Sequence, residues 1–263
     1  MEREILSTTR KALLINLDKR FYGTIAEIGG GQEVAGNFFK AGGASGTIAK
    51  TISAYDMAYS DYLYCKGKKE RYVSQDRLRK MLDIEYDELI NVLKGKRDES
   101  TCFFVFANTV VALNYQKNND ARGWLGVKFQ LIPNSPPNEV IIHVSLLEND
   151  NLLQQNTLGI LGVNLIHACF YHYDNPNNFL NSLMDNLSRD RIEITMIKMN
   201  GPQLNYIDNR LLSVQLVKNG MAQATMFDRY GNVFEPSDMV YKKNVLAFRG
   251  SFRPITYLGF DML

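Results

Sequence analysis

The clearest helical pattern covers residues 74–94, where apolar side chains recur every three or four positions. Ser74 is placed to accept a hydrogen bond from the first turn, and Gly95 can adopt the left-handed conformation that ends a helix. We therefore expect one helix over this range. Two shorter helices are expected over 176–187, which opens with a proline, and over 209–219, which a glycine follows.

A stretch without any charged residue runs from Asn151 to Tyr173 and is long enough to cross a bilayer. Its glutamines, asparagines and histidines would each need a hydrogen-bond partner in hydrocarbon, which is costly. We therefore expect a helix buried in the core of a soluble protein, and no membrane span. Gly159 and Gly162 would allow a neighbouring element to approach this helix closely.

From Cys102 the pattern becomes that of strands. Residues 102–113 are almost continuously apolar, as in a strand buried on both faces, and 125–131 alternate between apolar and polar. The connections are short and polar, which favours an antiparallel meander over crossover helices. The remaining predicted strands cover 140–147, 191–199, 221–227 and 244–249.

Strands and helices come in blocks, so the predicted fold class is α+β, with a mixed, largely antiparallel sheet and packed helices. We expect a glycine-rich N-terminal region over 1–100, which contains the helix 74–94, and an α+β core domain over 101–263. One continuous domain is the alternative.

Composition narrows the functional classes. The chain has 263 residues, of which 45% are hydrophobic and 22% charged, as in an ordinary globular protein. The net charge of +2 gives no sign of nucleic-acid binding. Three widely spaced cysteines and an N-terminus without a secretory signal predict a cytoplasmic protein without a disulfide framework.

A glycine cluster, Gly29-Gly30-Gly31, follows the apolar segment Ile25–Ile28. A strand that turns through glycines into a helix offers free amides to a phosphate. The segment is also similar to the ExGxG opening of cofactor-binding methyltransferases. Glu33 stands where the dinucleotide pattern has its third glycine, and the sequence downstream does not predict parallel strands. A tight turn that needs positive φ is the alternative reading.

Other chemical motifs are incomplete. Three residues separate Gly46 from Lys50, so the P-loop pattern fails. His143, His167 and His172 lack the spacing of metal ligands, and we expect no metal site. No G-x-S-x-G supports a serine nucleophile.

The segment from Gly250 to Thr256 reads Gly-Ser-Phe-Arg-Pro-Ile-Thr. It resembles the signature of adenylyltransferases that make dinucleotides and dephospho-coenzyme A, including nicotinate-nucleotide adenylyltransferase. The resemblance implies a phosphate-cradling turn and ATP with Mg²⁺ as cofactor, although the sequence itself leaves the cofactor unknown. Arg253 replaces the family's Asp, and Phe260 stands in place of its essential His, so the catalytic Gly-His pair is lacking.

A longer resemblance covers nearly the whole chain. The stretches NLDKRFYGTIAEIGGGQEVAGNFFKAGG, GTIAKTISAYDM and GILGVNLIHACFYHYDNP look like a bacterial family without an assigned mechanism. Its members often carry the label nicotinate-nucleotide adenylyltransferase, or sometimes TonB-dependent receptor. The chain is too short and alternates too little for the large membrane barrel of such a receptor.

Two main functional hypotheses follow. The first is a protein that binds a nucleotide or phosphorylated small molecule, and the second is a non-catalytic module for self-assembly, as a homo-oligomer, or for protein binding. A methyltransferase-like protein is a weaker third. Catalytic residues are unknown; for the first hypothesis the candidate binding residues are Gly29, Gly30, Gly31, Arg249, Ser251, Arg253 and Thr256.

Overall fold

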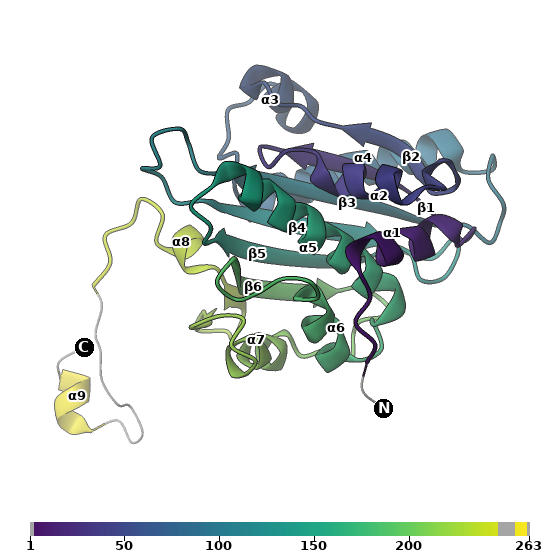
Figure 1. Cartoon of the computed structure of the whole chain (residues 1–263). Coiled ribbons are helices and arrows are strands. Elements are labelled where there is room, and N and C mark those ends of the chain that lie inside the picture. Colours follow the sequence, from purple (N-terminus) through teal and green to yellow (C-terminus); the bar gives the residue numbers. More distant parts are fainter. Residues whose placement is uncertain (1–2, 247–255, 262–263) are drawn as a thin grey trace.

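The centre of the molecule is a six-stranded mixed sheet in a computed structural model that describes residues 3–246 and 256–261 (Figure 1). Its strands are β1 (Phe21–Ile28), β2 (Ile48–Ile52), β3 (Cys102–Val111), β4 (Arg122–Phe129), β5 (Asn138–Leu146) and β6 (Ile192–Asn200). They lie in the order β2-β1-β3-β4-β5-β6. β1 pairs in parallel with β2 and β3, whereas β3 to β6 pair antiparallel. The predicted α+β class is confirmed.

Helices cover both faces of this sheet. One layer contains α1 (Thr8–Leu17), α2 (Glu33–Ala41), α5 (Asn151–Tyr171), α6 (Pro176–Leu183) and α7 (Asn209–Lys218). The opposite layer contains α3 (Met57–Cys65) and α4 (Gln75–Leu93). The shorter elements are η1 (Ala44–Gly46), α8 (Pro236–Met239), α9 (Tyr257–Asp261) and a hairpin of β7 (Met226–Phe227) with β8 (Val233–Phe234).

The two helical layers explain the apolar run in β3. Phe104 and Phe106 belong to the core under α5, while Phe103 and Val105 belong to the core under α4. A strand that is covered on both faces has no solvent side, so its residues need not alternate with polar ones. The helix 74–94 is confirmed too: the Ser74 side chain accepts a hydrogen bond from the Arg77 amide.

Several predictions need correction. The sequence did not indicate parallel strands after the glycine cluster, yet β2 and β3 both run parallel to β1. The strand expected over 221–227 is limited to β7, and its partner is β8 rather than 244–249, of which 247–249 lie outside the described residues. The helix expected over 176–187 ends at Leu183, and Asn186 takes a positive φ of 61°. The domain boundary near residue 100 stays a prediction; strands from both sides of it share one sheet.

The uncharged stretch forms α5 and lies in the core, as predicted. Several of its polar side chains find partners inside the protein, whereas both ring nitrogens of the buried His167 have no hydrogen-bond partner among the described residues. Gln154 donates to the Glu148 carbonyl and accepts from the Leu113 amide, and Asn164 donates to the carbonyls of Leu183 and Asp185. Among the described residues, no helix is both long enough and apolar enough to cross a membrane.

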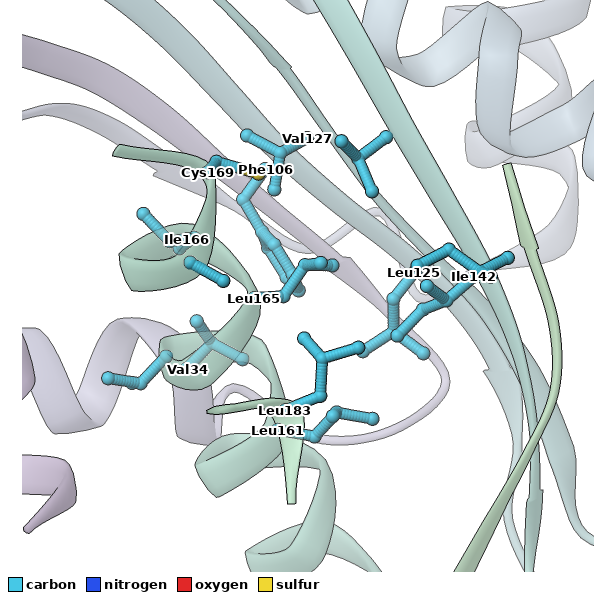
Figure 2. Close-up of a cluster of buried hydrophobic side chains, with 14 of the residues drawn as sticks. Val34, Phe106, Leu125, Val127, Ile142, Leu161, Leu165, Ile166, Cys169 and Leu183 are labelled. Atoms are coloured by element: carbon cyan, nitrogen blue, oxygen red, sulfur yellow. The ribbon is translucent and has the colours of Figure 1, made fainter. Parts of the chain in front are cut away.

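Close packing between α2 and α5 depends on glycine, as expected. Figure 2 shows Val34 of α2 beside the α5 side chains, which meet Phe106 of β3 and Leu125 of β4. A Cβ on Gly159 would lie 2.6 Å from the Cβ of Glu33, and a Cβ on Gly162 would overlap the Val34 side chain. The two helices can therefore touch along their backbones only because these side chains are missing.

We predict that Gly162→Ala lowers the free energy of unfolding by about 1 to 3 kcal/mol, because the added methyl group overpacks the contact with Val34. Gly36→Ala on α2 is the matched control. Nothing lies closer than 3.9 Å to its added Cβ, so the helix-propensity gain of about 0.5 to 1 kcal/mol should raise stability. Urea unfolding of both variants measures the difference. Equal effects of the two changes would contradict the packing argument.

Candidate functional site

The glycine cluster forms the predicted strand, turn and helix. β1 ends at Ile28 and α2 begins at Glu33, and between them Gly29 and Gly31 have φ values of 83° and 79°. Residues other than glycine rarely adopt this left-handed conformation, so both glycines are required by the backbone. The turn lies at the carboxyl ends of β1 and β3, where open sheets commonly bind ligands.

The turn is packed against neighbouring elements. Gly29 lies against the backbone carbonyl of Val110, and a Cβ on Gly30 would be 2.7 Å from the Leu158 side chain. A Cβ on Gly31 would be 3.0 Å from the Gln155 amide oxygen. In this arrangement the end of β3 and the first turns of α5 cover the glycine loop.

The amides at the start of α2 already hold an anion, the Glu27 carboxylate. Its two oxygens accept hydrogen bonds from the amides of Val34 and Ala35, at 3.0 and 3.1 Å. Glu27 is 2% exposed, and burial raises its pKa to about 7 in spite of these two donors. An external phosphate at this helix terminus would have to displace the Glu27 side chain.

The other four predicted site residues come from the end of the sequence. Arg249, Ser251 and Arg253 are outside the described residues. Thr256 directly precedes α9, and Figure 1 shows α9 away from the sheet. Whether these residues bind a ligand stays a prediction.

A different cavity, of about 700 Å³, opens between the start of α4 and the segment that carries β7, β8 and α8. On one side the Arg71 guanidinium forms an ion pair with Asp238, whose carboxylate also accepts the Gln75 backbone amide. Its lining is mostly charged or polar: Glu70, Arg71, Ser74, Gln75, Asp76, Lys80, Asp228, Phe234, Glu235, Asp238 and Lys243. Residues from two distant parts of the chain thus form one polar site.

His143 of β5 lies beneath this cavity. Its Nδ1 atom is 2.6 Å from Thr195 Oγ1 and 3.4 Å from Glu235 Oε1, and its ring packs on Trp124. A catalytic triad needs the acid and the nucleophile on opposite ring nitrogens, whereas here both partners lie at Nδ1. Burial and the nearby Arg122 lower the pKa of His143 to about 3, so the ring is neutral at pH 7. The contact between His143 and Glu235 joins the segment that carries β7, β8 and α8, which we call the C-terminal segment, to the sheet. These residues lack the geometry of a catalytic triad.

A second charged cluster lies between α1, α5 and α6. The Lys11 ammonium donates to Asn164 Oδ1 at 2.8 Å and to Asp185 Oδ2 at 2.7 Å, and Arg3 forms two hydrogen bonds with the same carboxylate. Lys11 and Asp185 are buried. Every donor of the ammonium has an acceptor once the Ser182 carbonyl is included, so this cluster is a structural clamp.

The three histidines do not converge on a metal. His143 lies on β5, while the rings of His167 and His172 are 5.4 Å apart at the other helical layer. Within residues 3–246 and 256–261, no group of three or more histidine, cysteine, aspartate and glutamate side chains is arranged to hold an ion.

Comparison with known proteins yields structural neighbours only. No protein-family model and no curated protein sequence matches the chain. The competence/damage inducible protein CihA from Agrobacterium tumefaciens is 14% identical, with a TM-score of 0.45, over 64% of this chain and 98% of that chain. A CinA superfamily protein from Klebsiella pneumoniae is 10% identical, with a TM-score of 0.44, over 64% and 99%.

A CinA superfamily protein from Escherichia coli is similar at 13% identity and a TM-score of 0.43, over 62% of this chain and 95% of that chain. These neighbours belong to a family different from the nicotinate-nucleotide adenylyltransferases that the sequence resembles over Gly250–Thr256.

The sequence offered one signal for Glu27, a single carboxylate within the otherwise apolar end of a strand. It offered none for the cavity. The cavity residues lie in the ranges 70–80 and 228–243, which only the folded chain brings together.

We predict that the stability difference between the wild type and Glu27→Gln depends on pH. The folded-state pKa of Glu27 is raised from 4.5 to about 7, so protonation favours the native state. The resulting stability is complete below pH 4.5 and is lost as the pH rises through 7, by about 3 kcal/mol. Glutamine cannot ionise, so the wild type should lose stability relative to the variant over this range. Urea unfolding between these pH values measures the difference, and a constant difference would contradict the prediction.

Proposed function

We propose that this protein is a non-catalytic module that associates with a second copy of itself through the outer face of α3. The observation that carries the proposal is a group of exposed large apolar side chains on α3 and just before it, Tyr55, Met57, Tyr59 and Tyr62, which we call the tyrosine face. Tyr55 is 80% exposed and Tyr62 is 72% exposed. Tyrosine is enriched at protein interfaces because it gives a large contact area with few rotatable bonds.

The exposure of these side chains follows from how α3 is held. Asp61, on the inner side of the helix, accepts hydrogen bonds from the Arg77 guanidinium and, at 2.7 Å, from the Tyr72 hydroxyl. Tyr64 donates to Glu85 of α4 at 2.8 Å. These buried contacts fix the rotation of α3, so its aromatic face cannot turn inward without breaking them.

The charges around the tyrosine face favour a second copy as the partner. Asp56 is exposed at the start of α3, and three exposed lysines, Lys66, Lys68 and Lys69, follow its end. If two copies of α3 pack antiparallel, the acidic start of each helix meets the basic end of the other. A twofold interface of this kind is self-complementary.

We predict that Tyr59→Lys combined with Tyr62→Lys weakens self-association by about 100-fold or more, because interface tyrosines often contribute more than 2 kcal/mol each. Light scattering coupled to size-exclusion chromatography measures the change. Tyr115→Lys is the matched control, since Tyr115 is fully exposed on a distant loop and its substitution should leave the oligomeric state unchanged. A wild type that is monomeric up to about 100 μM would refute the proposal.

The first hypothesis from sequence is a second candidate: binding of a nucleotide or a phosphorylated small molecule, with adenylyltransferase-like chemistry by resemblance. The observation that favours it is the position of Gly29, Gly30 and Gly31. The chain leaves β1 for β2 over one face of the sheet and reaches β3 over the other, so the loop lies at a topological switch point. The first amides of α2 already bind the Glu27 carboxyl group, so a phosphate at this position would have to take its place. ATP with Mg²⁺ is the probe that the resemblance suggests.

We predict for this candidate that Arg253→Ala abolishes any stabilisation by phosphate ligands and leaves the fold intact. Thermal unfolding with ATP, NAD, nicotinate mononucleotide and S-adenosylmethionine is the measurement, since a ligand at a hundred times its Kd adds about 2.7 kcal/mol. If a ligand stabilises the variant as much as it stabilises the wild type, Arg253 is not part of the binding site. A wild type that responds to none of these ligands would rule out the candidate.

A further inference from the structure

The cavity between the start of α4 and the C-terminal segment has no part in the proposed self-association. Its lining includes Asp238 of α8, which Figure 1 shows near one end of the sheet. The C-terminal segment is held there by the Arg71–Asp238 ion pair and by the Arg71 guanidinium, which lies 4.4 Å from the centre of the Tyr241 ring. The wall of the cavity is therefore an ordered part of the fold.

The charges that line the cavity do not balance. Five carboxylates face three cationic side chains. Two of the cations are already paired, Arg71 with Asp238 and Lys80 with Glu70. The carboxylate of Asp228 accepts amides of the β7–β8 turn. Asp76, Glu235 and Lys243 remain, so the open space carries an excess of negative charge.

Glu235 is the least compensated of these carboxylates. It is 7% exposed, and among the described residues it lies 3.4 Å from the neutral ring of His143. Its other oxygen accepts the Ser237 amide at 2.8 Å. Burial raises the pKa of Glu235, and this effect outweighs the opposing effects of the Ser237 donors and of Arg122.

Glu235 shares the cavity lining with an aromatic residue. Phe234 lines the cavity as well and is about one third exposed. A buried carboxylate and an aromatic side chain in one cavity match the needs of a cation that carries hydrogen-bond donors.

We propose that this cavity binds a small organic cation, with its ammonium or guanidinium group on Glu235 and the rest of the molecule between Phe234 and the start of α4. Such a ligand supplies the positive charge that the site lacks. A phosphate dianion would add to the excess negative charge and is disfavoured. The site is formed within one chain and does not depend on the tyrosine face.

Calorimetric titration of the full chain with agmatine and putrescine tests the proposal. Inorganic phosphate is the comparison ligand of opposite charge. We expect heat of binding with the amines. Glu235→Gln should weaken binding by at least about tenfold, because the amide can still cap α8 through its oxygen but carries no charge. Asp87→Asn is the matched control: it removes one exposed carboxylate from α4, away from the cavity lining, and should leave affinity unchanged.

The Lys243→Glu variant distinguishes loss of the binding site from misfolding of the variant protein. Removal of the remaining cation from the lining should tighten amine binding by about tenfold, and unfolding cannot produce a gain of affinity. The proposal is overturned if neither amine binds up to about 10 mM. It is equally overturned if phosphate binds in their place, or if folded Glu235→Gln binds the amines as the wild type does.

Discussion

The contact between α2 and α5 is the constraint on which the closed glycine loop depends. Gly159 and Gly162 allow the two helices to touch along their backbones, and this contact holds the start of α2 against the end of β1. Once α2 is there, its first amides point into a space without solvent, where unpaired N–H groups are costly. Glu27 supplies the acceptors. The packing of one helix pair thus determines the chemistry at the carboxyl ends of the parallel strands.

Other charged groups in the described structure also find their hydrogen-bond partners within the chain. The Asp238 carboxylate lies at the start of α4, with the Gln75 amide and the Arg71 guanidinium as donors. The Lys11 ammonium has three internal acceptors. A helix terminus or a buried ion that is satisfied within the chain has little to gain from an outside ligand. Groups that are left without such partners are therefore the better guide to binding, and they occur at the tyrosine face and around Glu235.

The sequence predicted what depends on local pattern. The caps of α4 and the double-sided burial of β3 could be inferred, because helix ends and strand faces leave their mark on adjacent residues. The parallel pairing of β1 with β2 and β3 could not, since it depends on which strands become neighbours after the intervening helices cross over the sheet. The glycine loop was located correctly, but its closure by Leu158 and Gln155 depends on residues more than a hundred positions away. Long-range contacts of this kind leave no periodic signal in one sequence.

The loop over residues 66–74 borders both the tyrosine face and the cavity that contains Glu235. Its first half carries Lys66, Lys68 and Lys69 at the edge of the tyrosine face, and its second half carries Glu70 and Arg71 in the wall of the cavity. Tyr72 of the same loop donates to Asp61 beneath α3. A ligand in the cavity could therefore affect self-association only by shifting this loop, since the loop is the part of the chain that borders both places. Because linkage between two binding equilibria is reciprocal, any effect of such a ligand on self-association must equal the effect of self-association on its affinity.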